Sequence, residues 1–444
     1  MVIVSLVQRL PCTESYQPTP GVVELNWSNE RPFTYYCYSD VIALYGADQF
    51  DQPGNFPYKT SWVENPGTPL RQVHYVEYPV LTGLFMWAGA QLAGGYADLA
   101  RDGVVPERLP VVVYFYLIAF WLLIAWLVVV WAVARLAGGD LRPALLVALS
   151  PLVLAQLFTN FDAPAVALAT GGLLAWSRRK PVLAGVLLGL GGAAKLYPLL
   201  LLIPLLALCL RAGKLRVGMR TLAGAAGSWL VVNLPIVLLF PTGWSFFYRF
   251  SADRGPGLES LYNIVSYFTG WSGIDPNLAP GQAPAVVNAV STVLFVGACL
   301  LVCLIALNAP IRPRLPQLGL LVVVAFLLTN KIYSPQYSLW LVPLAALAVP
   351  RWRLLIPWMT IDALVWVPTM LNQRSAISLS FFLAVVVVRD LALLIVCAFV
   401  VRDIYRPKVD PVRQGASADP CAGPLEGEPD RFVWRRRRPA LVAG

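Results

Sequence analysis

Long apolar segments, separated by short polar ones, fill most of the sequence after residue 109. A transmembrane helix needs about 20 predominantly apolar residues, so this pattern predicts an all-α polytopic membrane protein. Several segments fall short of that length, which requires tilted helices or helix ends beside protein-lined or water-filled space. The apolar segments lie near residues 109–134, 143–158, 163–177, 182–196, 198–210, 221–240, 285–308, 316–330, 336–350, 354–371 and 377–401.

The pattern is different before this bundle. Residues 1–10 (MVIVSLVQRL) are apolar but reach only about half the length of a spanning helix, and they lack the basic start and cleavage site of a signal peptide. We interpret them as a partial first transmembrane helix whose beginning lies upstream, with a short interfacial helix as the alternative. Residues 11–79 are rich in proline, acidic and aromatic residues, so they are expected in water or in the headgroup layer.

The orientation of the bundle follows from its basic residues. If the short apolar stretch 80–95 lies along the membrane surface, the basic clusters between the later helices all share one side. The positive-inside rule makes that side cytoplasmic. Residues 11–108 then form a large extracytoplasmic loop with a membrane-surface helix, and residues 241–284 form a second outer loop. Residues 402–444, which include the run Arg435–Arg438, are predicted to form a disordered, basic cytoplasmic tail.

Composition supports the membrane assignment and excludes several kinds of site. The chain has 444 residues, of which 58% are hydrophobic and 13% charged, against about 25% charged in soluble domains. Its net charge of +10 does not indicate nucleic-acid binding, because the basic residues sit in short runs between apolar segments. With His74 as the only histidine and no CxxC spacing, a zinc site or a Ser-His-Asp triad is not expected. We expect no metal or other cofactor.

Ionisable and polar side chains gather at the predicted outer face. Three of them, Lys195, Arg254 and Lys331, are exceptions to the positive-inside rule and are therefore candidates for binding an anion. An interfacial anchor is the alternative for each one alone. The full outer set is Asp40, His74, Glu77, Asp162, Lys195, Arg254, Glu259, Lys331 and Gln336.

Two of these cations lie in distinctive local sequences. Lys195 follows a glycine-rich apolar segment, where an ammonium is costly unless it meets an anion or water, although the glycines could instead serve close helix packing. Lys331 precedes Ser334–Pro335, and proline in a first helical turn leaves N–H groups that favour a phosphate. Asp162 heads another span, and we interpret it first as an N-cap.

Cysteines and mid-span charges have structural interpretations. Cys12 and Cys37 are the only cysteines in the first outer loop, so a disulfide between them is compatible with an oxidising compartment. Such a bond would anchor the loop that carries Asp40. In the last two spans, Asp362 and the pair Arg389–Asp390 are interpreted as partners that stabilise the bundle.

The stretch Tyr35–Asp40 (YYCYSD) is the strongest candidate for chemistry. Asp40 lies in the long polar loop before the bundle, and the neighbouring tyrosines, Tyr38 among them, could form a wall against a sugar. We therefore predict Asp40 as a general base. Glu77 is its closest competitor, but it precedes Tyr-Pro at a helix entrance, where a carboxylate often serves the helix dipole.

Four motifs together resemble a known family. They are Tyr38-Ser-Asp40, Val76-Glu-Tyr-Pro79, Ala194-Lys-Leu-Tyr-Pro198 and Lys331-Ile-Tyr-Ser-Pro-Gln-Tyr337. In this order they are similar to the actinobacterial membrane glycosyltransferases of family 87, which have the GT-C fold. The resemblance covers about residues 10–400. It departs from the family in its partial first helix and in the absence of any histidine beyond His74.

The resemblance implies a fold and a reaction. It implies a GT-C-like bundle of about 11–12 transmembrane helices, and relatives that are polyprenol-phosphate-mannose-dependent α-mannosyltransferases. A lipid-phosphate donor, inverting transfer at the extracytoplasmic face and a general-base aspartate in the first loop, here Asp40, follow from it. We assign donor-phosphate binding to Lys195, Arg254, Lys331 and Gln336, and substrate binding to Tyr38, His74, Tyr78, Asp162, Glu259 and Tyr337.

The reaction chemistry agrees with these residues. The leaving phosphate is already anionic, so the site needs a carboxylate to accept the acceptor's proton and cations to stabilise the phosphate. The sugar, mannose or arabinose, and the lipid-linked or glycan acceptor stay open. The alternative functions are a secondary transporter, which would be expected to show inverted repeats, and a lipid- or polyprenyl-phosphate-binding membrane protein without transferase activity.

Overall fold

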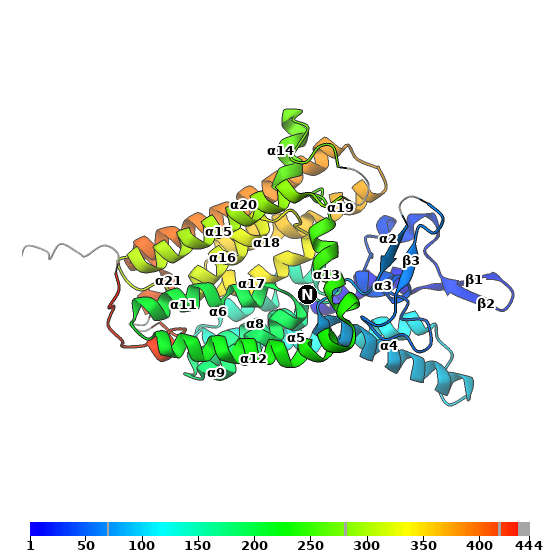
Figure 1. Cartoon of the computed structure of the whole chain (residues 1–444), viewed down its shortest axis with the longest axis horizontal. Helices are drawn as coiled ribbons and strands as arrows, with labels where there is room; N and C mark the ends of the chain where they lie inside the picture. The colour runs from blue at the N-terminus through cyan, green and yellow to red at the C-terminus, as the bar shows by residue number, and fades with distance from the viewer. Residues whose placement is uncertain (69–70, 279–281, 416–418, 434–444) are drawn as a thin grey trace, which may run out of the picture.

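The structure is a computed structural model that describes residues 1–68, 71–278, 282–415 and 419–433. Helices running in similar directions form an elongated bundle, and the N-terminal elements gather at one end of it (Figure 1). Within the described residues, five helices are long and apolar enough to cross a membrane. They are α5 (Pro110–Leu136), α12 (Leu215–Leu239), α15 (Ala285–Asn308), α18 with α19 (Trp352–Leu364 and Trp366–Gln373) and α20 (Leu379–Tyr405).

The remaining bundle helices are shorter, and proline begins several of them. The predicted span 143–158 is divided where Ser150 caps α7 and its hydroxyl accepts a hydrogen bond from the backbone of Leu152 at 3.2 Å. Proline fits the next position because it has no N–H to leave unpaired. The shorter helices are α6 (Arg142–Ala148), α7 (Pro151–Gln156), α8 (Asp162–Ser177), α9 (Pro181–Ala194), α10 (Tyr197–Leu200), α11 (Leu202–Arg211), α16 (Leu315–Thr329) and α17 (Ser338–Ala348).

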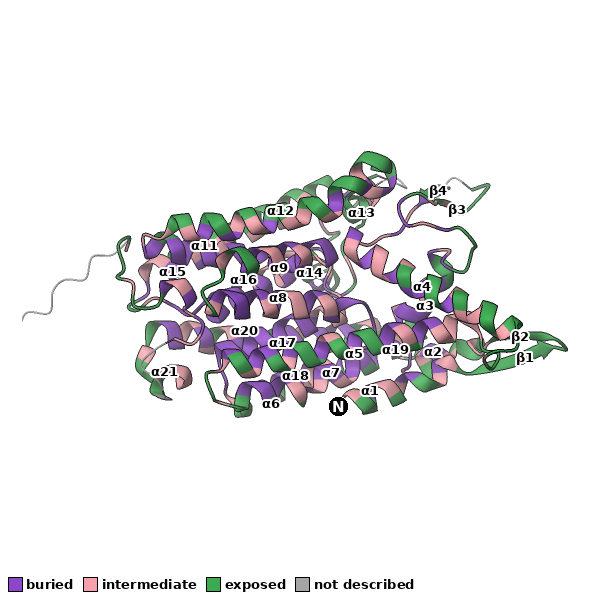
Figure 2. Ribbon diagram, turned by 90° about the horizontal axis from the view of Figure 1, so that it is seen from below, coloured by how far each residue is buried: buried purple, intermediate pink, exposed green. Residues whose placement is uncertain are grey.

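Burial separates a protein-facing core from a lipid-facing surface. Helices α16 and α17 are almost entirely buried, whereas α12 and α15 expose large apolar side chains such as Val231, Leu238 and Val293 (Figure 2). Exposed apolar side chains along helices of this length are compatible with hydrocarbon, not with water. The prediction of an all-α polytopic membrane protein is confirmed.

The first predicted loop contains short elements at one end of the bundle. After α1 (Val2–Arg9), two antiparallel hairpins form, β1 with β2 (Ser15–Thr19, Val22–Leu25) and β3 with β4 (Trp62–Glu64, Gln72–His74). Between the hairpins lie α2 (Arg31–Thr34) and α3 (Asp40–Ala47). Helix α4 (Val80–Arg101) follows and projects from this end of the bundle (Figure 1). It is not one of the five candidate spans in the described chain, and its course along the membrane surface stays a prediction.

Two segments that were predicted to lie outside the spanning helices contain helices of their own. The segment 241–284 contains α13 (Pro241–Asp253) and α14 (Leu261–Thr269). In the tail, α21 (Pro411–Gly415) follows α20, and described parts of 402–433 pack on the bundle instead of being disordered.

Charge pairing explains the ordered tail. Asp430 pairs with Arg211 at 2.6 Å and with Arg312 at 2.7 Å, and Asp410 pairs with buried Arg314 at 3.0 Å. Composition predicted disorder because it could not show that the arginines at this end of the bundle have their counter-ions in the tail. The run Arg435–Arg438 lies outside the described residues.

Candidate active site

Asp40 is the first residue of α3, and its backbone is fixed against the loop between α7 and α8. Ser39 is the N-cap: its hydroxyl accepts from the Val41 amide at 3.2 Å and donates to the Phe158 carbonyl at 2.6 Å. The Asp40 amide donates to the Thr159 carbonyl at 2.8 Å. These bonds place a half-buried carboxylate beside the start of α8.

Asn160 connects this carboxylate to two other parts of the chain. Its amide nitrogen Nδ2 donates to Asp40 Oδ2 at 2.5 Å and to the Tyr78 hydroxyl at 2.8 Å. Its oxygen Oδ1 accepts from Lys195 Nζ at 3.5 Å. One buried amide thus joins the first loop, the entrance to α4 and the end of α9, and fixes one oxygen of Asp40.

Lys195 follows the last residue of α9, and its backbone is extended, which ends that helix before α10 begins. The chain turns back at this point, so that Leu199 packs against the glycine-rich end of α9. A Cβ at Gly192 would lie only 2.4 Å from Leu199 Cγ, so a side chain there would not fit. Close packing therefore explains these glycines. Lys195 Nζ lies 3.5 Å from Asp162 Oδ1, and 4.9 and 5.7 Å from the ring centroids of Tyr78 and Tyr337.

Asp162 is not an N-cap, which corrects that interpretation. Phe161 occupies the N-cap position of α8 and makes no side-chain capping bond. Instead, Asp162 Oδ1 accepts from Trp340 Nε1 at 2.8 Å, while buried Oδ2 has no hydrogen-bond partner. Trp340 stacks on Tyr337 at a centroid distance of 4.3 Å and on Tyr197 at 4.5 Å. The carboxylate thus holds an aromatic stack beside Lys195.

The surroundings of Asp40 favour a basic carboxylate. Burial raises the pKa of Asp40, and the Asp162 carboxylate raises it further. Hydrogen bonds from Asn160 and Tyr38 and the charge of Lys195 act in the opposite direction. Tyr38 itself stacks on Phe33 at 5.6 Å. Asp40 is therefore a stronger proton acceptor than an exposed aspartate and is still accessible.

Glu77 belongs to a second cluster, with His74. His74 Nδ1 lies 3.7 Å from Glu77 Oε1, and Nε2 lies 3.3 Å from Glu64. Helix α4 begins after Pro79 without a side-chain cap, so Glu77 contacts His74 instead of capping the helix. Burial raises the pKa of Glu77 to about 7, while the charge of Arg254 lowers it.

Glu77→Gln is expected to flatten the dependence of thermal stability on pH. The raised pKa means that folded Glu77 keeps a proton that the unfolded chain releases between about pH 5 and 7, so its contribution makes stability fall as pH rises through this window. One such group contributes at most about 1.4 kcal/mol per pH unit. Melting temperatures of detergent-purified protein across this range measure the slope, with the exposed Glu24→Gln as the control. A wild-type slope in Glu77→Gln would contradict the assignment.

Lys331 is a buried cation held by neutral acceptors. Its Nζ donates to the Asn288 side chain at 2.6 Å and to the Ala252 carbonyl at 2.9 Å. Burial lowers the pKa of Lys331, the charge of Arg254 lowers it further, and Asp253 opposes them. Arg254 is exposed, and its guanidinium carbon Cζ lies 5.9 Å from the centroid of the Phe250 ring. Gln336 is half-buried and lies in the 3₁₀ turn Pro335–Tyr337.

Glu259 is placed in a separate buried network. It pairs with Arg389, which also pairs with Asp390 at 3.0 Å and lies 3.9 Å from the Tyr333 ring centroid. Asp362 was expected to join the Arg389–Asp390 pair, but its Oδ1 accepts from Ser338 at 2.9 Å. This network supports the segment that carries Lys331 and Tyr337.

Sequence reasoning selected Asp40, Tyr78, Asp162, Lys195 and Tyr337, and the structure brings these together. It does not place His74 or Glu259 in that cluster. Asn160 and Arg9 were missed: an asparagine beside Asp162 and an arginine ending an apolar stretch gave no signal of their partners. Among the described residues, no group of three His, Cys, Asp or Glu side chains is placed to hold a metal ion.

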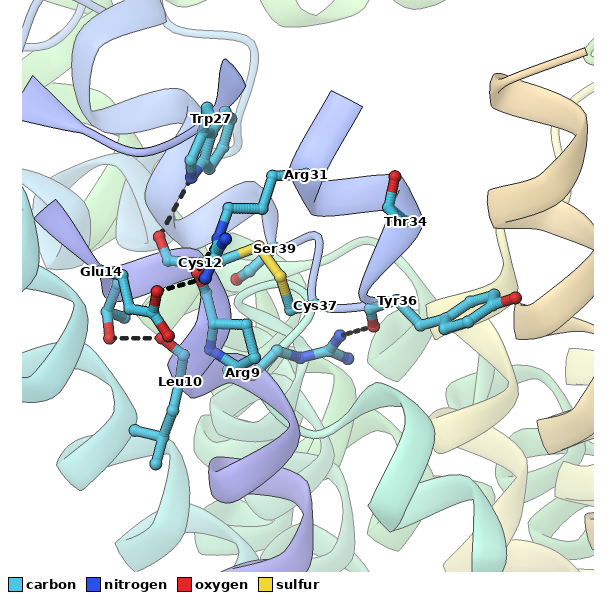
Figure 3. The surroundings of a disulfide bond; sticks show 12 residues. Arg9, Leu10, Cys12, Glu14, Trp27, Arg31, Thr34, Tyr36, Cys37 and Ser39 are labelled. Atoms are coloured by element: carbon cyan, nitrogen blue, oxygen red, sulfur yellow. Dashed lines mark hydrogen bonds and ion pairs between the residues drawn. A yellow bond between two sulfur atoms is a disulfide. The ribbon is translucent and has the colours of Figure 1, made fainter. Parts of the chain in front are cut away.

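A disulfide joins Cys12 and Cys37, with Cα atoms 5.6 Å apart (Figure 3). Cys12 lies in the 3₁₀ turn after α1, and Cys37 is three residues before Asp40. The bond ties the backbone leading to the carboxylate to the end of the first helix.

Comparison with known proteins identifies the family. No curated protein is significantly similar to the chain. The sequence model of glycosyltransferase family 87 matches residues 76–329, which include Tyr78, Asn160, Asp162 and Lys195 but not Asp40 or Lys331. This match covers more than half of the chain. The protein therefore belongs to glycosyltransferase family 87 and is a membrane glycosyltransferase.

Proposed function

We propose that this protein transfers a sugar, mannose in the first instance, from a polyprenyl-phosphate donor to a lipid-linked or glycan acceptor, with inversion. The observation that carries the proposal is the environment of Asp40. This half-buried carboxylate is fixed by Asn160, and burial raises its pKa. Lys195 lies nearby but forms its ion pair with Asp162, so Asp40 is left to accept a proton.

The reaction proceeds in one displacement. The acceptor oxygen attacks the anomeric carbon while the bond from that carbon to the phosphate oxygen breaks, and the acceptor's proton moves to Asp40. Attack opposite the leaving group inverts the anomeric centre, through an oxocarbenium-like transition state as in inverting glycosidases. The polyprenyl phosphate leaves as an anion, so a general acid is unnecessary.

Cations at the same end of the bundle stabilise the departing phosphate. Lys331 has only neutral hydrogen-bond acceptors among the described residues, which leaves its charge available to an anion. Arg254 is exposed nearby, and its charge influences both Lys331 and Glu77. Lys195, beside Asp162 and Tyr337, and Gln336, in the adjoining turn, complete the proposed phosphate site.

The proposed site faces the extracytoplasmic side. The tail lies at the end of the bundle opposite the N-terminal elements (Figure 1). Its Asp430 pairs with Arg211, the last residue of α11, and with Arg312. The positive-inside rule places that end and the tail in the cytoplasm. Asp40 then lies outside, where the disulfide between Cys12 and Cys37 is stable.

Purified protein incubated with radiolabelled polyprenyl-phosphate-mannose and membrane glycolipid extract tests the proposal. We expect labelled product to form with wild-type protein and not with Asp40→Asn. Parallel incubations with polyprenyl-phosphate-arabinose and with nucleotide-activated mannose separate the donor classes. Transfer from the nucleotide sugar, with none from either lipid-linked sugar, would overturn the proposal.

A further inference from the structure

We propose that Arg9 is a positioning residue for Asp40, holding together the two backbone segments that carry Asp40 and Asn160. This inference rests on the proposed role of Asp40 as general base. Arg9 is the last residue of α1, and its side chain is fully buried. It reaches the site through backbone and hydroxyl groups instead of touching the substrate.

The guanidinium of Arg9 bridges two segments that are remote in sequence. Nη1 donates to the Tyr36 carbonyl at 3.1 Å, as Figure 3 shows. Nη2 donates to the Ala155 carbonyl at 2.5 Å and to Thr159 Oγ1 at 2.7 Å. The Arg9 side chain thus contacts the backbone four residues before Asp40 and the turn immediately before Asn160.

Tyr36 is unusual in two ways: its backbone conformation is strained, and its carbonyl accepts three hydrogen bonds. Tyr36 has a φ of 55°, in the left-handed region that non-glycine residues seldom adopt. Besides Arg9, its carbonyl accepts from Gln8 Nε2 at 3.2 Å and from Trp366 Nε1 at 3.0 Å. Three donors from α1 and α19 therefore hold this carbonyl, which lies four residues before the start of α3.

The segments held by Arg9 are those that bond to one another at the site. The Asp40 amide donates to the Thr159 carbonyl at 2.8 Å, and Asn160 follows Thr159 directly. A shift of either segment would change the hydrogen bond between Asn160 and Asp40. A displacement of about 1 Å at a reacting group can cost roughly 10²-fold in rate.

The charge of Arg9 has a second consequence. All its hydrogen-bond acceptors in the described chain are neutral, and its guanidinium lies 5.0 Å from the Trp366 ring centroid. A buried cation without an ion-pair partner favours nearby negative charge, and an attraction links Arg9 and Asp40. The other ionisable groups that act on Asp40 include Lys195, Asp162 and Tyr38; Asp48 and Tyr78 interact with it as well.

The test compares Arg9→Met and Arg9→Lys in detergent, with polyprenyl-phosphate-mannose as donor. Arg9→Met should lower kcat by about 10²-fold while the donor KM changes less than about threefold. It should also move the acid limb of the kcat profile to higher pH, because Asp40 loses a stabilising cation. Arg9→Lys should lower kcat but leave that limb in place, since it keeps the charge and loses the forked geometry.

The disulfide supplies a matched control. Replacing Cys12 and Cys37 with serine removes a covalent tether between the end of α1 and the segment before Asp40, but removes no charge. Stability should therefore fall without a shift of the acid limb. A folded Arg9→Met with an unchanged limb, or Arg9→Lys with wild-type kcat, overturns the proposal. If Arg9→Met does not fold, the kcat of Arg9→Lys decides. Wild-type protein that transfers no sugar from any lipid-phosphate donor instead points to failure of the proposed function.

Discussion

Asp40→Asn is expected to lower turnover by roughly 10²–10⁴-fold, because an amide cannot accept the proton that a general base removes. The substitution keeps the size of the side chain. Ser39 still caps α3, and the Asp40 backbone bond to Thr159 is unaffected. Donor binding and melting temperature should therefore stay close to those of the wild type. Initial rates of mannosyl transfer at saturating donor measure the effect.

A matched control lies at the other end of the same short helix. Asp48 is the C-cap residue of α3, and burial raises its pKa well above the usual range. Asp48→Asn should change turnover by no more than a few-fold. Normal turnover in Asp40→Asn together with an inactive Glu77→Gln would show that Glu77 is the base.

The fold was largely predictable because hydrocarbon places a strong constraint on sequence. A spanning helix must satisfy its own backbone groups in an apolar environment, so it appears as a long apolar run. Breaks inside runs were less visible. The division of the predicted span 143–158 at Ser150 was not foreseen. The break between 182–196 and 198–210 was predicted, but not its packing: Leu199 fills the space that a side chain at Gly192 would need.

The site was predicted as separate residues and not as an arrangement. Lys195 and Asp162 could be selected because charge in an apolar run is costly, but their pairing required the folded chain. Asn160 gives no such signal. An amide is uncharged, and its role arises only when Asp40 and Tyr78 arrive from segments 120 and 82 residues away.

The order of the C-terminal tail could not be predicted for a different reason. The tail is rich in proline and arginine, which indicates disorder when the chain is considered alone. Its order depends on complementary charge: Asp430 binds Arg211 and Arg312, and Asp410 binds Arg314. Local composition contains no information about a partner that lies about one hundred residues or more away.

Lys331→Met is expected to weaken binding of the donor about tenfold or more, because a hydrogen bond to a charged group contributes roughly 1.5–3 kcal/mol. Lys331 is buried with neutral acceptors, and burial lowers its pKa. A bound phosphate would favour its charged form, so donor affinity should also fall as pH rises through the pKa of Lys331. Competition by polyprenyl monophosphate measures the phosphate contact without the sugar, and the exposed Lys180→Met is the control at the opposite end.

Lys195→Met should behave differently, which separates the two cations. Its removal leaves Asp162 buried without the positive charge 3.5 Å away, so stability should fall together with donor affinity. In Lys331→Met, whose partners are neutral, affinity should fall with little change in melting temperature. Acceptor KM should stay near wild type in both variants. Wild-type affinity for polyprenyl monophosphate in Lys195→Met, Arg254→Met and Lys331→Met alike would refute a phosphate site at these residues, because no proposed cation would then contribute to holding the leaving group.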